Sequence, residues 1–399
     1  MIEKKQCCGC RACEQICPKG CIEMIEDKEG FIYPKINKEK CIECGLCEKI
    51  CPMINNEKIK QKEEKKVYRM TTNNKELIKN SSSGGAFSLI VEEIIKNNTN
   101  KKYKIYGCTL DEDLVARHKG VDNIEKISIF RKSKYVQSDL QNTYRNIKGE
   151  LKEGKNVIFT GTPCQVAGLV NFVGKENTKN LYTIDLICHG VPSPMVFNKY
   201  LKYLERENKA EIKSFNFREK LKLINIIDSL GINIELKNDK IIKEYSFNNL
   251  YMLGFFKGLY YRPCCEFCPF ANIDRVSDIT IGDFWGINKK YKNLNPHEGI
   301  SLCMVNSQKG QNIIKGLSER VNIVEEKSEL AVENNKNLSK PSVFSLDRQK
   351  FFDELIKTDN FGETIKLFIK KKSKLRFWLT SNIDDNLKDK IKRLIKNIK

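Results

Sequence analysis

Short apolar runs alternate with helically spaced apolar residues through the middle of the chain, and this alternation predicts an α/β fold. Apolar runs of strand length predict strands at residues 67–72, 105–110, 113–117, 156–159, 181–187, 278–282 and 300–305. Helical spacing predicts helices at residues 86–95, near 123–129, at 195–208, and in a segment that ends at Phe172. Because strands that alternate with helices build largely parallel sheets, we expect a mixed sheet covered by helices.

Other patterns flank this region. Apolar residues around a Lys-Glu-Gly turn predict a hairpin at 22–25 and 31–33, and alternation predicts an antiparallel meander at 213–218, 232–236 and 241–245. An aromatic-rich helix is predicted at 248–260. Residues 55–66 are polar and charged, which is typical of a linker. After about residue 345 the chain is helical and basic, and helically spaced apolar residues near its end favour a docking helix over a membrane-surface helix.

The charge balance changes this picture little. The chain has 399 residues, with 71 Lys and Arg against 51 Asp and Glu, a net charge of +20. A basic chain invites a nucleic-acid function, but the excess is mostly Lys scattered among Glu, Asn and Ile. We therefore interpret it as surface composition and expect no nucleic-acid partner. Long-range attraction of an acidic redox partner stays compatible with it.

Cysteine usage indicates the compartment. Seventeen cysteines at clustered metal-ligand spacing argue for the reducing cytoplasm of an anaerobe rather than for disulfides. Residues 1–5 run straight into the first cysteines and leave no room for a signal peptide. No apolar run approaches the ~18 residues that span a bilayer. We expect a soluble, cytoplasmic protein without a membrane span.

The first 52 residues contain one cysteine pattern twice, C-x2-C-x2-C-x3-C-P, with the two starts 34 residues apart. Three closely spaced thiolates converge on one cubane cluster, and the fourth reaches the other cluster. The stretch resembles the bacterial two-cluster ferredoxin domain and predicts two 4Fe-4S clusters. In the crossed arrangement, one cluster takes Cys7, Cys10, Cys13 and Cys51, and the other takes Cys41, Cys44, Cys47 and Cys17.

Zinc is the alternative for these sets, but zinc sites pair two C-x2-C knuckles and have no use for a third equally spaced thiol before Cys-Pro. Cys8 and Cys21 fall outside the spacing, and we interpret them as small packing residues. Cys108 and Cys303 lie inside apolar strands and are most simply core residues.

Ligand-binding signals occur at helix starts and strand ends. Residues 81–85, Ser-Ser-Ser-Gly-Gly, open a helix, where free N–H groups suit a phosphate, although Ser and Gly also form ordinary caps. Residues 160–165 and 188–192 each follow a strand, where α/β sheets bind ligands. The polar residues 131–138 predict a surface loop.

Four more cysteines could hold a third cluster. Two end consecutive strands and two form a C-x2-C knuckle: Cys164, Cys188, Cys265 and Cys268. Cys264 competes with Cys265, and we favour Cys265 because it keeps the two-residue spacer. His189 follows a proposed ligand, so it could supply a proton as a catalytic residue, orient the cluster, or be structural.

Six short segments occur in a particular order: Ser-Ser-Gly-Gly-Ala-Phe, Lys-Tyr-Val-Gln-Ser, Gly-Thr-Pro-Cys-Gln, Cys-His-Gly, Arg-Pro-x-Cys-x-x-Cys and Ser-Asp-Ile-Thr-Ile-Gly-Asp-Phe-Trp-Gly. In this order they resemble the beta subunit of the coenzyme F420 (deazaflavin) hydrogenase/dehydrogenase family, over roughly residues 1–310. The resemblance implies a flavin enzyme with a 4Fe-4S cluster beside the flavin. It implies that FAD is held by Ser82, Ser83, Gly84, Gly85, Lys134, Tyr135, Gln137, Ser138, Thr160, Gly161, Thr162 and Pro163.

The leading hypothesis is an iron–sulfur flavoprotein oxidoreductase that acts on a small-molecule or deazaflavin-type substrate. The alternatives are a non-catalytic electron-transfer subunit of a larger redox complex and a regulatory iron–sulfur protein. We expect a redox partner protein or a small electron donor or acceptor, and a homo-oligomer or partner subunit. The expected domains are a ferredoxin-like domain at 1–54, a linker at 55–66, a flavin and iron–sulfur domain at 67–310, and a basic helical region at 311–399.

Overall fold

A mixed sheet of eight strands forms the centre of the molecule. The computed structural model describes residues 2–61, 63–98, 100–223, 226–295, 298–319 and 321–369. The strand order is β13-β3-β12-β11-β7-β6-β4-β5, and the pairs β4–β6, β6–β7 and β7–β11 are parallel. The strands are β3 (Lys66–Thr71), β4 (Tyr103–Leu110), β5 (Ala116–Val121), β6 (Asn156–Gly161), β7 (Leu181–Leu186), β11 (Ile279–Asp283), β12 (Ser301–Val305) and β13 (Asn322–Glu326). The predicted α/β class with a mixed sheet is confirmed.

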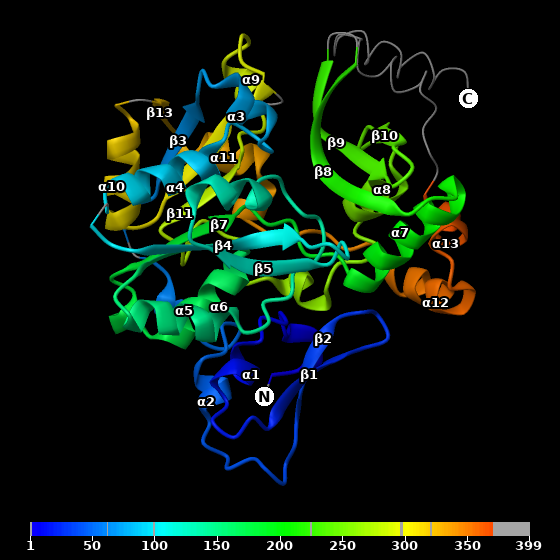
Figure 1. The fold of residues 1–399 in the computed structure, drawn as a ribbon, viewed down its shortest axis with the longest axis horizontal. Coiled ribbons are helices and arrows are strands. Elements are labelled where there is room, and N and C mark those ends of the chain that lie inside the picture. Colours follow the sequence, from blue (N-terminus) through cyan, green and yellow to red (C-terminus); the bar gives the residue numbers. More distant parts are fainter. Residues whose placement is uncertain are drawn as a thin grey trace.

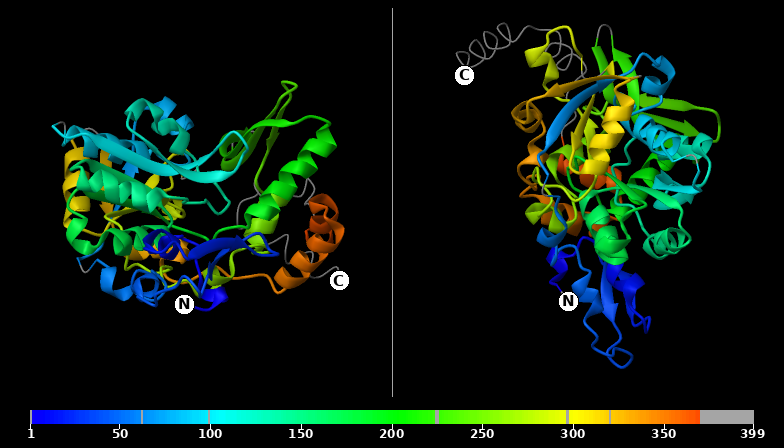
Figure 2. Two further views of the ribbon diagram at one scale, coloured as in Figure 1. Left: turned by 60° about the horizontal axis from the view of Figure 1, so that its bottom comes forward. Right: turned by 90° about the vertical axis from the view of Figure 1, so that its left-hand side faces the viewer.

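Helices cover both faces of this sheet (Figures 1 and 2). Alternate residues of β6 explain why: Ile158 packs into one apolar cluster with α4 (Ala86–Lys96) and α10 (Gln308–Leu317). Val157 and Phe159 pack into another cluster with α5 (Thr143–Lys152) and α6 (Pro163–Val173). Successive side chains of a strand point to opposite faces, so a fully apolar strand is covered twice. The smaller helices α3 (Lys75–Lys79), α9 (Ile287–Lys290) and α11 (Ser328–Asn334) lie nearer the β3 end of the sheet.

A second lobe is built around the predicted meander, at the right of Figure 1. Its antiparallel sheet has the order β10-β9-β8, and an aromatic-rich core joins it to four helices. The strands are β8 (Ile212–Leu223), β9 (Ile226–Leu236) and β10 (Ile241–Glu244), and the helices are α7 (Pro194–Asn208), α8 (Leu250–Lys257), α12 (Arg348–Thr358) and α13 (Phe361–Phe368).

The N-terminal residues form a small part that projects from the rest of the molecule in Figure 1. It contains α1 (Ala12–Ile16), α2 (Leu46–Lys49) and a hairpin of β1 (Ile22–Glu26) and β2 (Ile32–Ile36), paired antiparallel as predicted. The following segment, predicted as a linker, lies on the body: Ile59 is buried, and the backbone N–H of Gln61 donates to the carbonyl of Arg275.

Three local predictions differ from the structure. The strand predicted at 113–117 begins only at Ala116, because Asp111 accepts hydrogen bonds from the N–H groups of Asp113 and Val115 in a tight turn. Residues 124–130 form a 3₁₀ rather than an α-helix. The predicted surface loop at 131–138 is wrong in its second half, where residues 136–138 are buried. The predicted apolar helix near the chain end lies outside the described residues beyond 369.

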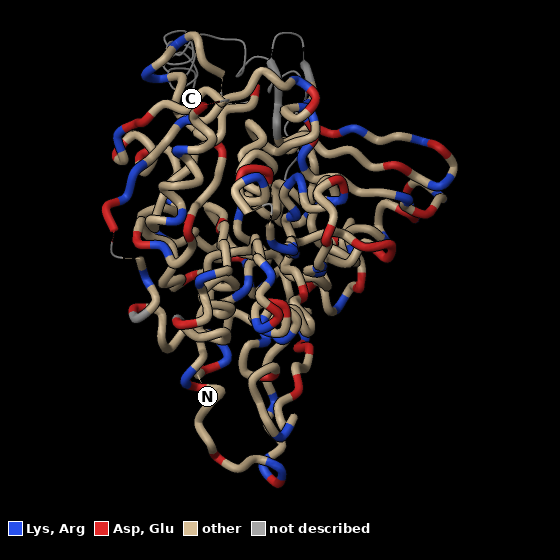
Figure 3. Tube along the Cα trace, turned by 60° about the vertical axis from the view of Figure 1, so that its left-hand side comes forward, with Lys and Arg blue, Asp and Glu red and all other residues tan. Residues whose placement is uncertain are grey.

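In the view of Figure 3, Lys and Arg positions are interspersed with Asp and Glu positions along the described part of the chain trace. No helix among the described residues has the length and apolarity needed to cross a membrane.

Candidate functional site

The first cysteine set converges as the crossed arrangement predicts. Cys7, Cys10, Cys13 and Cys51 line one small cavity together with Cys47. The pKa of the Cys13 thiol is raised to about 12, first by burial and then by the proximity of Cys7 and Cys51. Cys8 also lines this cavity. The second repeat thus brings Cys51 beside the first three cysteines, and its role as the fourth ligand stays a prediction.

The second set lies nearer the surface. Cys44 is exposed, and Cys17, Cys41 and Cys47 are partly buried. The Sγ atoms of Cys17 and Cys21 lie 3.4 Å apart, and Cys21 also interacts with Cys41. Cys21 is buried, as predicted for a packing residue, but it packs between two proposed ligands.

The third set also comes together. The pKa of the Cys188 thiol is raised well above its usual value by burial and then by Cys265, Cys164 and Cys268. Cys188 follows β7, and Cys164 is the second residue of α6. Cys265 and Cys268 flank the end of the 3₁₀ helix Pro263–Phe267.

The neighbours of Cys264 and Cys265 differ. Cys264 is buried in the cluster that also holds Cys8 and Cys10. Cys265 packs against the edge of the same cluster, and it is also a neighbour of the other members of the third set. The geometry therefore favours Cys265, in line with the spacing argument.

The donor chemistry of these three sets fits iron–sulfur clusters. Close thiols raise one another's pKa because two neighbouring thiolates repel, and a bound metal removes that penalty. No group of three His, Cys, Asp or Glu side chains in the described ranges is arranged to hold a single metal ion. A cubane offers a different iron to each cysteine, so its ligands need not meet at one point.

Cys8 lies between two of the sets. Its side chain is 6% exposed, and it interacts with Cys10 of the first set and Cys164 of the third. The pKa of the Cys8 thiol is raised well above its usual value, first by the Cys10 thiol and also by burial. The packing interpretation of Cys8 holds, and what it packs against are two proposed ligands.

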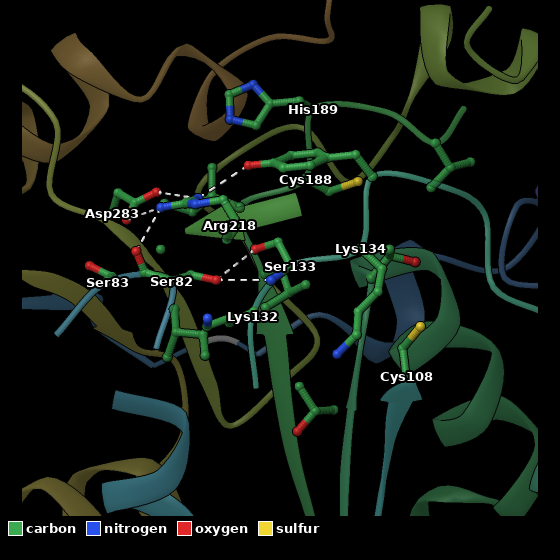
Figure 4. A pocket seen from close by; sticks show the side chains of 18 of the residues that line it. Ser82, Ser83, Cys108, Lys132, Ser133, Lys134, Cys188, His189, Arg218 and Asp283 are labelled. Carbon is green, nitrogen blue, oxygen red and sulfur yellow. Dashed lines mark hydrogen bonds and ion pairs between the residues drawn. The ribbon is translucent and has the colours of Figure 1, made fainter. Parts of the chain in front are cut away.

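A cavity of about 530 Å³ opens beside the third set, between the sheet and the second lobe (Figure 4). That volume lies within the usual range for small-molecule and cofactor sites. Residues predicted from three separate segments line it, together with Cys188 and His189: Ser82, Ser83, Gly85, Lys134, Tyr135, Ser138, Thr160, Gly161 and Thr162.

Three predicted cofactor residues lie behind this lining. The N–H of Gly84 donates to Ser301 Oγ, and a Cβ added there would lie 2.5 Å from the carbonyl oxygen of Gly299. Pro163 is buried as the first residue of α6. Gln137 is buried and donates to the carbonyl of Cys8. These residues shape the walls of the site.

One end of the cavity suits an anion. Helix α4 begins there with Ala86 and Phe87 in the lining, and its N-cap residue is Gly85, which has no side chain to cap the helix. Uncapped N–H groups and the helix dipole attract phosphates. Arg131 and Lys132 lie in the same wall. Thr160 Oγ1 is buried without a hydrogen-bond partner in the described part of the chain, which leaves a polar atom for a ligand.

A buried ion pair organises the cavity. Arg218 on β8 donates to both carboxylate oxygens of Asp283 on β11, at 3.0 and 3.1 Å. The same guanidinium donates to the Tyr135 hydroxyl and to the carbonyl of Ser82 (Figure 4). Burial lowers the pKa of Arg218, but the charge of Asp283, the neighbouring Tyr135 and the hydrogen bonds to both together outweigh burial and raise this pKa. Sequence reasoning missed Arg218, because no motif marks it within the meander.

His118 is a further cavity residue that the sequence did not reveal. Burial lowers its pKa to about 4, so the ring is neutral near pH 7. Nδ1 lies 3.1 Å from Ser138 Oγ and Nε2 lies 3.1 Å from the carbonyl of Thr160. Lys134 shares the wall, and burial lowers its pKa to about 8. Cys108, predicted as core, is half-buried and also lines the cavity.

His189, predicted as catalytic, lies at the cavity with an exposed ring (Figure 4). Desolvation by the surrounding protein lowers its pKa, the charge of Asp283 opposes this, and that of Arg218 adds to it. A neutral imidazole that water reaches at this place can accept a proton or donate one.

An α/β body that carries clustered cysteine sets and an apolar-walled ligand cavity defines a class of iron–sulfur protein. Residues 6–54 match the 4Fe-4S dicluster domain, and residues 154–330 match the family described as the C terminus of the Coenzyme F420 hydrogenase/dehydrogenase beta subunit. The chain therefore carries one segment that is similar to a 4Fe-4S dicluster domain and a second segment that is similar to the C-terminal part of this beta subunit. The resemblance predicted from the motifs is confirmed, and so are iron–sulfur clusters as a cofactor class.

Similarity outside these two family matches is distant. No curated protein matches the sequence. A chain of the F420-reducing NiFe hydrogenase complex from Methanosarcina barkeri, in a xenon-derivatized structure, is similar with a TM-score of 0.45 and 14% identity, over 75% of this chain and 90% of that chain. A likeness at that level supports no conclusion about function.

Proposed function

We propose that this protein is an iron–sulfur flavoprotein oxidoreductase, in which electrons pass between the N-terminal clusters and a bound FAD that acts on a small-molecule or deazaflavin-type substrate. The observation that carries the proposal is one cavity lined by Ser82–Ser83, Lys134–Tyr135 and Thr160–Thr162, with Cys188 in the same wall. Flavin would supply the conversion between one-electron and two-electron transfer.

The chain's own residues suit this role. The uncapped start of α4, with Arg131 and Lys132, would bind the pyrophosphate. Tyr135 and Phe255 form an aromatic pair with ring centroids 4.9 Å apart and would hold a planar ring system. His189 would accept or release a proton at its imidazole.

The order of the cysteine sets supports an electron route. Cys8 interacts with Cys10 of the first set and Cys164 of the third, and Thr162 Oγ1, at the cavity wall, lies 3.2 Å from Cys164 Sγ. The exposed Cys44 brings the second set to the surface, where a redox partner would dock. Clusters on these sets would form a path from the surface to the cavity.

The test is anaerobic purification of the full chain, followed by a visible spectrum, flavin extraction and an iron count. We expect about twelve irons, as three cubanes, and one FAD per chain. Iron without flavin, even after incubation with excess FAD, would overturn the flavoprotein proposal and favour the electron-transfer subunit instead. Zinc in place of iron would overturn the electron-transfer role as well.

A further inference from the structure

Arg262 is a fully buried cation that has no acidic partner among the described residues. Its side chain is 0% exposed, and no carboxylate in the described ranges lies within ion-pair distance of it. Its guanidinium donates to three neutral oxygens: the carbonyl of Cys7 at 2.6 Å, the carbonyl of Ile32 at 2.8 Å and Oε1 of Gln137 at 2.9 Å. Hydrogen bonds of this kind leave the net charge uncompensated.

Burying an unpaired charge is costly unless another charge balances it. The rings of Tyr33 and Phe31, with centroids 4.4 and 5.3 Å from the guanidinium carbon, provide part of the compensation through cation–π contacts. Arg218, by contrast, is a buried arginine whose two terminal nitrogens donate to the carboxylate of Asp283. Arg262 therefore needs a counter-charge that the described protein side chains do not provide.

The place of Arg262 in the fold shows where that charge would come from. Its side chain holds the carbonyl of Cys7, in the first cysteine set, and its own carbonyl accepts a hydrogen bond from the N–H of Cys265, in the third set. Its N–H donates to the carbonyl of Val191, three residues after Cys188. Arg262 is thus hydrogen-bonded into the ligand loops of two proposed clusters.

Gln137 and Gly9 fix the guanidinium between these loops. Gln137 accepts from Arg262 and donates to the carbonyl of Cys8 at 3.0 Å. Gly9 has φ +68°, and a Cβ added there would lie 2.7 Å from Nη1 of Arg262. A glycine is required at this point because the guanidinium packs directly against the ligand loop.

We propose that Arg262 is the counter-charge of the two clusters that flank it, the one on the first cysteine set and the one on the third, and that it raises the reduction potentials of both. The inference rests on the proposed clusters. Four thiolates give each cluster a net negative charge, and reduction adds one more. A buried cation favours that addition, because electrostatic interactions are strong where water is excluded. Arg262 is accordingly a positioning residue for electron transfer.

The experiment compares Arg262→Gln and Arg262→Lys with the native full-length protein, each loaded anaerobically. Potentiometric titration followed by electron paramagnetic resonance gives the potential of each cluster. We expect Arg262→Gln to lower the potentials of the two flanking clusters by about 59 mV or more, a tenfold change in the one-electron equilibrium. The cluster on Cys17, Cys41, Cys44 and Cys47 is the internal control and should keep its potential. Arg262→Lys keeps the positive charge but lacks the planar guanidinium group, so we expect it to shift the two potentials less.

A second control distinguishes the effect of the Arg262 charge from the effect of loosening the contact between the N-terminal part and the body. Arg348 also fastens the N-terminal part to the body, but its guanidinium pairs with Glu29, at 3.1 Å from Nη1 to Oε1. The double variant Glu29→Gln/Arg348→Gln removes that clamp without changing the net charge. Because the charge of Arg348 also acts on Cys265, this control is evaluated on the cluster of the first set, whose potential should stay in place.

Unchanged potentials in Arg262→Gln, or an equal shift of all three clusters, would overturn the inference. If Arg262→Gln fails to retain iron, the comparison of Arg262→Lys with native protein decides, since only a selective shift of the flanking clusters supports the inference. Absence of clusters from the native protein would instead overturn the proposed function.

Discussion

The two terminal nitrogens of Arg218 each donate to one carboxylate oxygen of Asp283, so a strand of the meander is joined to a strand of the central sheet by a bidentate ion pair. The side chains are 3% and 10% exposed. Because the same guanidinium reaches the carbonyl of Ser82, the pair also fixes the loop that opens α4.

Breaking this pair from one side should be strongly destabilising. Asp283→Asn leaves a buried guanidinium uncompensated, and we expect a loss of roughly 3–5 kcal/mol in the free energy of unfolding. Denaturant unfolding of the purified variant measures it. Arg218→Met combined with Asp283→Leu removes both charges and should recover a large part of the loss. A double variant no more stable than the single one would show that the charges are not the cause.

Replacing Cys265 and Cys268 by Ser should remove one cubane, about four irons per chain, and leave the N-terminal clusters in place. The matched control is Cys264→Ser, next in the chain and buried in the cluster that also holds Cys8 and Cys10. The measurement is the iron content of the double variant, the control and the native chain, each reconstituted with iron and sulfide in parallel. Equal iron in the double variant and the native chain would show that the third set binds no cluster.

Charge at the first turn of α4 should control flavin binding. Ala86 lines the cavity at the helix start, so Ala86→Asp would place a carboxylate against a bound phosphate. An acidic residue at this end of a helix interacts favourably with the helix dipole. Ala86 is only 4% exposed, so the comparison below uses a polar control of the same size. We expect at least a tenfold weaker FAD affinity than in Ala86→Asn, which is nearly isosteric and uncharged. Fluorescence titration of the apoprotein measures both. Equal affinities would mean that no phosphate lies there.

Gly84→Asp, which the loop sequence alone suggests, is a poorer test. An added Cβ would lie 2.5 Å from the backbone oxygen of Gly299 and 3.0 Å from that of Met70. The variant would displace the backbone whether or not a phosphate binds nearby, so loss of flavin from it would not identify the cause.

His118 should make stability depend on pH. Its pKa in the folded protein is lowered to about 4, whereas an unfolded histidine titrates near 6.5. The unfolded chain therefore binds the proton first as the pH falls. Stability is fully present above about pH 6.5 and declines by about 3 kcal/mol toward pH 4. Denaturant midpoints from pH 7.5 to 4.5 should fall more steeply in the native chain than in His118→Gln. Parallel curves would contradict this.

The sequence predicted the strands and helices of the body well because each is a local pattern. The run around Ile158, for example, is apolar at successive positions. Both faces of such a strand must be covered, so the sequence alone predicts a buried strand. The same reasoning was wrong for part of residues 131–138. Their polarity predicted a solvent-exposed loop, but residues 136–138 are buried against partners that are far away in the chain. Gln137 bonds to Arg262, and Ser138 lies beside His118.

The candidate site was likewise predictable only where a local pattern in the sequence marks its residues. Spacing predicted that Cys51 lies near the first three cysteines, because the pattern itself encodes the geometry. The third set was predicted from two strand ends and a C-x2-C knuckle. Arg218 was beyond reach, since its partner Asp283 is 65 residues away and neither residue's local sequence refers to the other. The contact of Cys8 with Cys164 could not be predicted either, because the two residues are far apart in the sequence.

A cluster on the first cysteine set, as proposed, would impose an order on biosynthesis. The set is incomplete until Cys51 has been made, and Cys10 is only 8% exposed once the N-terminal part lies against α6, where a Cβ added at Gly168 would be 3.2 Å from its sulfur. Arg262, which closes the junction, is synthesised some two hundred residues later. Between those two moments the site is still open to the machinery that delivers iron and sulfide. Slow synthesis of the intervening body would lengthen that interval, and an apoprotein that folds completely first would have to open again before it could be loaded.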